Sequence, residues 1–207
     1  MEDPMQINVE PLARSEASHA SEMLSRAFAK DPIITHYLSN SGLPAFFRAV
    51  LEQMFPAGHV YAARCDGNLV GVAAWMSPDP PNPDPAEQEA AASYKQVVET
   101  MFPQEARQLF AGFATLAQFH PGDPHWYLAF VGIDPSMQSR GVGRALLAPV
   151  LKIADDSKTF CYLETPFLRT HAFYERLGFK RYGEHSPFDG APQGVETFLR
   201  KPSLILE

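Results

Sequence analysis

The sequence predicts an α/β domain with a mixed β-sheet flanked by helices. Apolar residues recur at helical spacing in several segments, and short β-prone runs separate those segments. Two of these runs, residues 59–65 and 69–76, are joined by Asp66-Gly67-Asn68, a turn typical of an antiparallel hairpin. The chain has 207 residues, 45% of them hydrophobic, which is enough for one core. We therefore expect a single domain over residues 1–207.

The N-terminal part is predicted to contain one strand and two helical regions. Residues 6–11 form the strand, and residues 16–29 form an amphipathic helix whose apolar face packs on the sheet. A second helical region follows Asp31-Pro32 and stops at Pro56, because proline cannot continue a helix. Its apolar side consists of Phe46, Phe47, Val50, Leu51, Met54 and Phe55.

A proline-rich segment separates the hairpin from the next helical region. Five of the eight residues from 78 to 85 are proline, which excludes a helix there. The segment could be a domain linker, but the strands on both sides fit one sheet, so we favour a helical insertion over residues 78–120. Its helical pattern, residues 86–119, breaks at Phe102-Pro103. Its aromatic residues could form core or a lid over a substrate pocket: Tyr94, Phe102, Phe110, Phe113 and Phe119.

The C-terminal part alternates strands with helices and ends in a pair of strands. Pro149 lacks the N–H that would bond to the preceding turn, so we expect a kink or an early end of its helix. Gly178 is the expected left-handed terminator of the last helix. The predicted elements are strand 125–133, helix 141–154, strand 160–164, helix 170–177 and strands 179–184 and 195–201.

The strongest functional signal lies where the central strand leads into a helix. Gly141 and Gly143 carry no Cβ, so the backbone at this helix start can approach a ligand closely, and a helix start attracts anions. The charged residues from 138 to 154 are Arg140, Arg144 and Lys152, with no acid among them, in a chain of formal net charge −7. The pattern predicts a site for a phosphate or pyrophosphate.

A dinucleotide site of the Rossmann type is one alternative for this segment. Glu164, at the end of the next strand, lies where a Rossmann site has the acidic residue that binds the ribose. However, seven residues separate Ile133 from Gly141, and the position of the third glycine holds Leu146. These departures disfavour a Rossmann site.

Two motifs resemble the GNAT superfamily of N-acetyltransferases. Residues 138–143, Gln-Ser-Arg-Gly-Val-Gly, are similar to its Q/R-x-x-G-x-G/A signature, and the preceding residues 131–135 resemble its L/V-x-V-x-P run. Residues 173–179, Phe-Tyr-Glu-Arg-Leu-Gly-Phe, resemble its F-Y-E-x-x-G-F segment. The departures are the long insertion, Pro149 in the cofactor helix, and Thr170 where many relatives have asparagine.

The resemblance implies a mostly antiparallel sheet and transfer of an acetyl group from acetyl-CoA to an amine, by direct attack within a ternary complex. The cofactor-binding core would span about residues 125–180. The central strand would splay from strand 160–164, and the pantetheine arm would bond to the backbone of Val131 and Ile133 in the gap. The pyrophosphate would contact Gln138, Ser139, Arg140, Gly141, Val142, Gly143 and Arg144.

The resemblance also implies catalytic roles, each with a structural alternative. Tyr174 matches the general acid of the family, although it could simply pack on the sheet. An amine must lose a proton before it attacks, so a base is needed. We rank Glu164 first, acting through water, and His125 second; Glu164 could instead bind substrate and His125 could be a surface residue. Tyr127 occupies the usual base position, but a phenol titrates near 10. The N–H of Ile133 would stabilise the oxyanion.

The acceptor is less well defined. A primary amine of a small molecule is favoured, since an aromatic insertion would narrow an open groove; a protein or peptide amine, and a non-catalytic acyl-CoA sensor, are alternatives. Acceptor pockets of this family involve the first two helices, the loop near residues 187–194 and any insertion. Candidate residues are Phe28, Tyr37, Trp75, Trp126 and the insertion aromatics.

Composition indicates the remaining properties. The negative net charge argues against broad nucleic-acid binding. The chain has no run of about 18 apolar residues, and residues 1–28 lack the features of a secretory signal, so we expect a cytoplasmic protein without membrane contact. Cys65 and Cys161 lack the spacing of a zinc site, so we expect no metal and two buried thiols. The apolar tail, residues 204–206, could support a homodimer.

Overall fold

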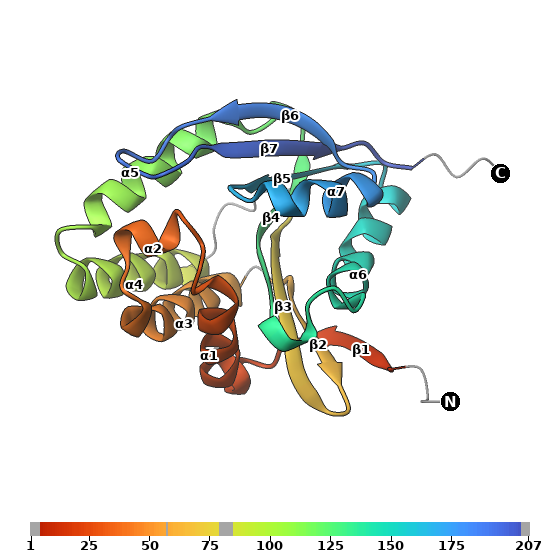
Figure 1. Cartoon of the computed structure of the whole chain (residues 1–207), viewed down its shortest axis with the longest axis horizontal. Helices are drawn as coiled ribbons and strands as arrows, with labels where there is room; N and C mark the ends of the chain where they lie inside the picture. The colour runs from red at the N-terminus through yellow and green to blue at the C-terminus, as the bar shows by residue number, and fades with distance from the viewer. Residues whose placement is uncertain (1–4, 57, 79–84, 204–207) are drawn as a thin grey trace.

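A seven-stranded sheet runs through the molecule, with the strands in the order β1-β2-β3-β4-β5-β7-β6 (Figure 1). The computed structural model describes residues 5–56, 58–78 and 85–203; the tail at 204–206 and most of the proline-rich segment lie outside them. The strands are β1 (Ile7–Pro11), β2 (Val60–Cys65), β3 (Asn68–Met76), β4 (His125–Ile133), β5 (Phe160–Thr165), β6 (Lys180–His185) and β7 (Val195–Arg200).

All neighbouring strands are antiparallel except β4 and β5, which confirms the mixed, mostly antiparallel sheet. The parallel ladder between them runs only from His125–Phe160 to Leu128–Leu163. Beyond Leu128, β4 stays paired with β3 as far as Ile133 and separates from β5. This confirms the predicted splay of the central strand.

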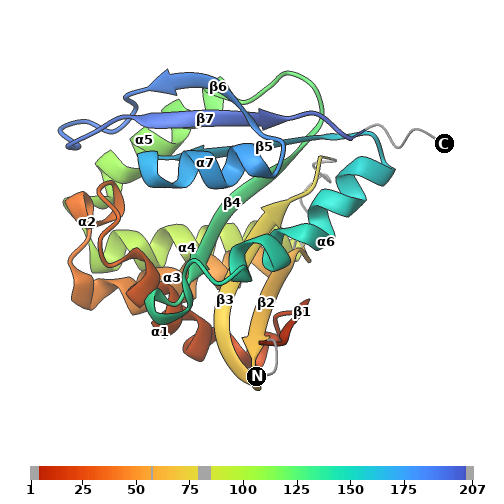
Figure 2. The same cartoon turned by 45° about the vertical axis from the view of Figure 1, so that its right-hand side comes forward.

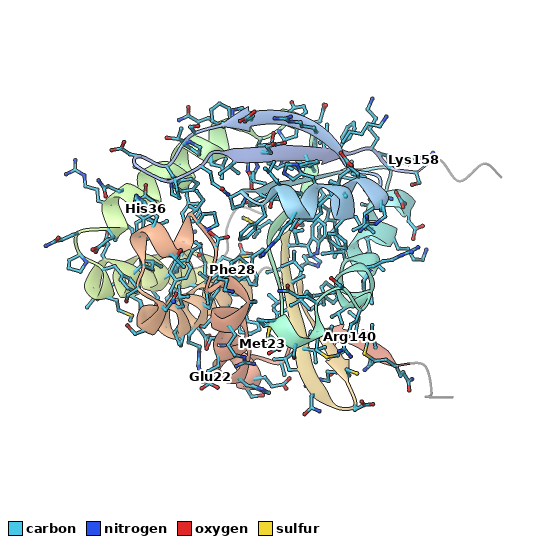
Figure 3. The ribbon with its side chains drawn as sticks, in the orientation of Figure 1. Glu22, Met23, Phe28, His36, Arg140 and Lys158 are labelled. Atoms are coloured by element: carbon cyan, nitrogen blue, oxygen red, sulfur yellow. The ribbon has the colours of Figure 1, made fainter. Side chains whose placement is uncertain are left out.

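Helices cover both faces of the sheet. In Figures 1 and 2, α1, α3 and α4 lie on one side of β3 and β4, and α6 lies on the other. The amphipathic pattern of the first helix is confirmed, since Met23 is buried and Glu22 is exposed (Figure 3). The helices are α1 (Ala17–Phe28), α2 (Ile34–Tyr37), α3 (Leu43–Met54), α4 (Pro85–Met101), α5 (Ala106–Leu116), α6 (Val142–Asp156) and α7 (Leu168–Arg176).

The insertion extends the helical layer rather than forming a second domain. Helix α4 packs on α3, and α5 follows the predicted break at Phe102-Pro103. Phe102 is buried against Gly42, where an added Cβ would lie 2.3 Å from its ring. Most insertion aromatics thus belong to the core on this face of the sheet.

The predicted early end of the helix at Pro149 is wrong, because α6 continues to Asp156. Leu146 and Val150, on either side of the proline, are fully buried. Packing of this apolar face holds the helix together although Pro149 removes one backbone hydrogen bond. The second predicted helical region is interrupted, since Leu38 is extended between α2 and α3. The remaining predicted elements agree with the structure within a few residues at their ends.

Three smaller expectations can also be compared with the structure. Gly178 has a φ of +89° directly after α7, as predicted for the helix terminator. Cys65 and Cys161 are free and buried, as predicted. Within the described residues, no helix combines the length and the apolar character needed to cross a membrane.

Candidate active site

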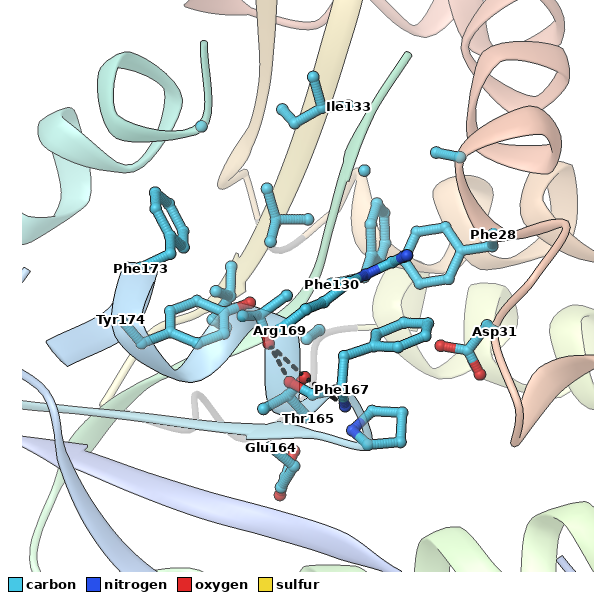
Figure 4. Close-up of a pocket in the computed structure, with 18 of the residues that line it drawn as sticks. Phe28, Asp31, Phe130, Ile133, Glu164, Thr165, Phe167, Arg169, Phe173 and Tyr174 are labelled. Carbon is cyan, nitrogen blue, oxygen red and sulfur yellow. Dashed lines mark hydrogen bonds between the residues drawn. The ribbon is translucent and has the colours of Figure 1, made fainter. Parts of the chain in front are cut away.

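A cavity of about 700 Å³ opens where β4 and β5 separate (Figure 4). Residues from both helical layers line it. Arg144 of α6 and Phe173 and Tyr174 of α7 come from one face of the sheet, while Phe28 of α1 and Phe113 of α5 come from the other. The splay therefore connects the two faces, so two substrates can meet in the gap from opposite sides.

The backbone of β4 turns polar groups toward this gap. Asp134 N donates to Val70 O at 2.9 Å, and Ile133 lies opposite Gly71. Because antiparallel pairs alternate between bonded and non-bonded positions, Gly132 bonds to β3, and the N–H and C=O groups of Val131 and Ile133 point away from β3. Gln138 Nε2 donates to Ile133 O at 3.2 Å from the same side. This orientation is the one that the predicted pantetheine contacts require.

The glycine-containing loop supplies a second set of backbone donors. Gly141 has a φ of +84° and precedes α6, and the bond from Ala145 N to Gly141 O, 3.1 Å, closes the first helical turn. The N–H groups of the preceding residues at the helix start therefore have no acceptor within the helix. An added Cβ at Gly143 would lie 3.1 Å from the Phe173 ring. Gly143 is thus also needed for α6 to approach α7, a reason that the sequence did not reveal.

Most predicted cofactor contacts line the cavity, and two do not. Arg140, labelled in Figure 3, lines a separate depression together with Cys65 and Asp66, and the side chain of Val142 belongs to the core. Val142 can therefore offer only its backbone N–H. The residues that line the cavity are Val131, Ile133, Gln138, Ser139, Gly141, Gly143 and Arg144.

Tyr174 has the surroundings of a proton donor. Its ring is buried against Phe173, Phe179 and Phe198, and its hydroxyl points into the cavity (Figure 4). Burial raises the pKa of Tyr174 above its ordinary value, so the phenol stays protonated through the neutral range. Thr170 Oγ1 lies 3.0 Å from Thr165 Oγ1 and holds the start of α7 against β5.

Glu164 lines the cavity on the other face of the sheet. Its side chain extends from β5 opposite to Thr165 and is only 6% exposed (Figure 4). Glu164 Oε1 lies 3.1 Å from Nε2 of His120, but this buried oxygen accepts no hydrogen bond from the residues that the structure describes. Burial and, second, the charge of Glu164 raise the pKa values of Tyr127 and Tyr162. These phenols remain neutral beside the carboxylate.

His125 lies outside the cavity lining, at the start of β4. Its Nε2 is 3.1 Å from His120 Nδ1, and its Nδ1 is 2.8 Å from the carbonyl oxygen of Asp123. His120 therefore stands between His125 and Glu164. The sequence analysis missed His120, because nothing in the pattern shows that the end of the insertion folds back onto β5.

The acceptor side of the cavity is mainly aromatic. Phe28, Phe113 and Phe188 line it, as expected for the first helix, the insertion and the loop at 187–194. Tyr37, Trp75 and Trp126 were wrong candidates, since all three are buried in the core. Further lining residues that the sequence analysis missed are Asp31, Phe130 and Phe167.

A β-bulge explains why Phe130 was missed. Ala74 pairs with Phe130 and Trp75 pairs with Leu128, so β4 has one extra residue, Ala129, at this point. Simple alternation would place Phe130 on the face of Leu128, in the core. The bulge shifts the alternation by one residue and turns Phe130 toward the acceptor side.

Asp31 combines a structural contact with a place on the cavity wall. Its Oδ1 accepts hydrogen bonds from the N–H groups of Ile33 at 2.9 Å and Ile34 at 2.8 Å, and so caps the start of α2. Burial raises the pKa of Asp31. An aspartate directly before a helical segment is a capping signal that the sequence contains.

Comparisons with known proteins agree with this geometry. A sequence model described as the acetyltransferase (GNAT) family matches residues 29–179. An N-acetyltransferase of Schizosaccharomyces pombe is 25% identical over 196 residues, which cover 88% of this chain and 78% of that protein. The N-alpha-acetyltransferase RimI of Mycobacterium tuberculosis is 23% identical over 181 residues, covering 87% of this chain and 83% of RimI.

A solved structure is similar over nearly the whole chain. The crystal structure described as histone acetyltransferase HPA2 and related acetyltransferase, from Corynebacterium glutamicum, has 29% sequence identity and a TM-score of 0.72. The match covers 98% of this chain and all of the other. The overall fold described above is therefore similar to that of a solved acetyltransferase.

Proposed function

Since the chain belongs to the acetyltransferase (GNAT) family, it is an acetyl-CoA-dependent N-acetyltransferase, and we propose that its acceptor is the primary amine of a small molecule with an apolar body. One observation carries the proposal. The acceptor side of the cavity is walled by phenylalanines from α1, α5 and the loop at 187–194. Such walls favour an apolar group beside the reacting amine.

The insertion restricts access to this half of the cavity. Phe188 packs edge-on against Phe113 with ring centroids 5.4 Å apart, so the loop at 187–194 rests on α5. Phe188 is 6% exposed, which leaves little freedom for the loop while this contact holds. A cavity walled by aromatic rings suits a compact amine better than an extended protein segment.

We assign the steps of the reaction to residues of both faces. The backbone of Val131 and Ile133 and the loop at 138–144 bind acetyl-CoA. Glu164 takes the proton of the amine through water, which frees the nitrogen lone pair for attack on the thioester carbonyl. The N–H of Ile133 stabilises the resulting oxyanion. Tyr174 donates its proton to the departing CoA thiolate, which needs one as the carbon–sulfur bond breaks.

Two other functions remain as outcomes of the test. A protein or peptide amine is favoured by the name of the M. tuberculosis relative, an N-alpha-acetyltransferase. A non-catalytic acyl-CoA sensor would need neither the phenol of Tyr174 nor the carboxylate of Glu164, and both line the cavity. The presence of these two groups supports an enzyme.

The experiment combines a binding measurement with an amine panel. Thermal unfolding with and without acetyl-CoA should show a rise in Tm, because a ligand that binds only the folded state stabilises it. CoA release is then followed with phenethylamine, spermidine and a peptide with a free N-terminus. We expect the highest kcat/KM with phenethylamine. Preference for the peptide would contradict the small-molecule acceptor, and binding of acetyl-CoA with no turnover of any amine would favour the sensor.

A further inference from the structure

The end of the insertion carries a histidine that contacts the buried carboxylate of the site. His120 follows α5 and lies against both β4 and β5, since its ring is 4.6 Å from those of Tyr127 and Tyr162. The preceding residue, Phe119, stacks flat on His185 of β6 at 3.6 Å. These aromatic contacts hold the imidazole of His120 against Glu164.

A chain of close contacts links Glu164 to the outside. Glu164 Oε1 is 3.1 Å from His120 Nε2, His120 Nδ1 is 3.1 Å from His125 Nε2, and His125 Nδ1 is 2.8 Å from Asp123 O. Glu164 lines the cavity, whereas His125 is partly exposed and outside the lining. The chain thus connects the acceptor side of the cavity with solvent through two imidazoles.

Counting protons shows what such a chain does. Its two ends, a carboxylate and a carbonyl oxygen, can only accept hydrogen bonds. Three links need three protons, but two neutral imidazoles carry only two. Without a third proton, two acceptor atoms face each other at one link, which is unfavourable in a buried site. The series of contacts from Glu164 to Asp123 can therefore take up one proton more than its two neutral imidazoles carry.

We propose that Glu164, His120 and His125 act together as the base of the acetyl transfer, with His120 and His125 as positioning residues that take the proton from Glu164 toward solvent. This inference rests on the proposed function, in which Glu164 deprotonates the amine. The N–H bond of the amine breaks, the nitrogen keeps the electron pair for attack, and the proton completes the third link of the chain. His125 later releases a proton to water.

The surrounding groups support this assignment. His120 is faced by Glu164, His125, Tyr127 and Tyr162, and Tyr182 and His185 lie beyond these neighbours. Both facing phenols stay neutral, since burial and the Glu164 charge raise their pKa values. Among the residues that the structure describes, no group of three or more His, Cys, Asp or Glu side chains is arranged to hold a metal ion.

The test uses a residue that cannot touch either substrate in the cavity. In His125→Phe, His120 has no histidine partner at Nδ1, so a neutral His120 can donate to Glu164 and no third proton is needed. The rising limb of kcat/KM against pH should then move about one pH unit lower, because in the shortened pair of Glu164 and His120 no contact is left without a proton, so the pair takes up a further proton less readily than the full chain. The kcat should fall about tenfold because the path of the proton through His125 to solvent is lost. His59→Phe is the control, since the ring of His59 packs edge-on against Trp126 and is not part of the chain.

The amine substrate titrates in the same way in every assay. A difference between variants in the dependence of kcat/KM on pH therefore comes from the enzyme. The Tm shift with acetyl-CoA shows whether His125→Phe is folded and binds the cofactor. If it does, and the rising limb of kcat/KM lies at the same pH as in the wild type, the proposal is overturned. A shift of the limb in His59→Phe as large as that in His125→Phe would also overturn it. A lower kcat with an unmoved limb would mean a merely structural residue.

A second measurement does not need an acceptor. In the ¹⁵N-labelled protein, the ring nitrogen shifts show which nitrogens carry protons. We expect three protons on the nitrogens of His120 and His125 together at pH values below the rising limb of kcat/KM, and two above it, where the chain can accept the proton of the amine. In Glu164→Gln we expect no such change over the same pH range. An unchanged number of protons across the limb in the wild type would overturn the chain. If the wild type shows the change but no amine is acetylated, the proposed acceptor is wrong while the proton chain stands.

Discussion

At the scale of single residues, the two proposed proton-transfer groups are kept apart by the sheet. Tyr174 reaches the cavity from α7 among phenylalanines, and Glu164 reaches it from the opposite face among histidines and tyrosines. A donor and a base that touched each other would exchange the proton directly. Their separation lets the acid act on the thiolate and the base act on the amine.

Tyr174→Phe tests the acid. We expect kcat to fall about 100-fold, because the CoA thiolate then leaves without a proton, while the KM for acetyl-CoA changes little. Burial raises the pKa of Tyr174, so the wild-type phenol is protonated across the neutral range and the loss should be the same from pH 6 to 9. CoA release at saturating substrates measures it. The phenylalanine keeps the ring contacts with Phe179 and Phe198, so an unchanged turnover number would exclude the acid role.

Sequence reasoning selected Tyr174 and Glu164, which both line the cavity, but not His120, and the reason is physical. The first two are recognised from local motifs and from their place at the ends of predicted elements. The contact of His120 with Glu164 depends on how the end of the insertion folds back over β5, which no periodicity in the chain specifies. His125 was selected for a direct role because the intervening ring was unknown.

At the scale of elements, the splay between β4 and β5 follows from unequal pairing. β4 continues along β3 to Ile133, while its ladder with β5 ends at Leu128. The bulge at Ala129 lies next to that point and bends β4 further from β5. The existence of the elements was predictable from spacing, but a bulge is set by pairing across strands and leaves no signal within one strand.

One ion pair connects strand β7 with helix α6. Arg200 of β7 makes two bonds to Asp155 of α6, at 2.8 and 2.7 Å, and its Nε donates to Leu177 O at 2.9 Å after α7. Arg200 is nearly buried, with 7% of its side chain exposed. The pair thus links β7, α6 and the end of α7, the elements that support the cofactor side of the cavity.

Asp155→Asn should lower the free energy of unfolding by about 3 kcal/mol at pH 7, since a nearly buried arginine loses its counter-charge. The hydrogen bonds from Arg200 lower the pKa of Asp155 below its ordinary 3.8. The stabilisation is therefore present above pH 3.8 and disappears as the pH falls through the lower folded-state value, where wild type and variant should converge.

Urea unfolding at several pH values measures this difference. Asp156→Asn is the matched control, because Asp156 pairs with Lys152 on the exposed side of the same helix and should contribute only about 0.5 kcal/mol. Equal losses in the two variants would show that the Arg200 pair does not hold these elements together.

At the scale of the whole molecule, the cavity divides into a half beside the loop at 138–144, where we propose that the cofactor binds, and a half lined by α1, α5 and the loop at 187–194. The first half could be proposed from the sequence because a glycine-containing loop before a helix forms a recognisable motif. The acceptor half depends on side chains from α1, α5 and the loop at 187–194, which come together only in the folded chain. Its residue types were visible in the sequence, but their arrangement was not.

The contact between α5 and that loop allows the two halves to be separated by experiment. Gly112 of α5 lies directly under Phe188, and an added Cβ would be 2.2 Å from the ring, so in Gly112→Ala the ring must move. Phe188 lines the acceptor side of the cavity, and its ring contacts are with Tyr37 and Phe113. We expect the KM for the amine to rise about tenfold, or about 1.4 kcal/mol, while the KM for acetyl-CoA is unchanged.

Steady-state kinetics with each substrate varied in turn measures both constants. Gly122→Ala is the matched control, since a Cβ there meets no atom within 4 Å, and it should leave both constants as they are. If Gly112→Ala raised the KM for acetyl-CoA equally, the two halves of the cavity would be coupled through the sheet. An effect confined to the amine would mean that the insertion sets acceptor selection independently of cofactor binding, because Phe188 is held by α5 rather than by the cofactor-binding elements.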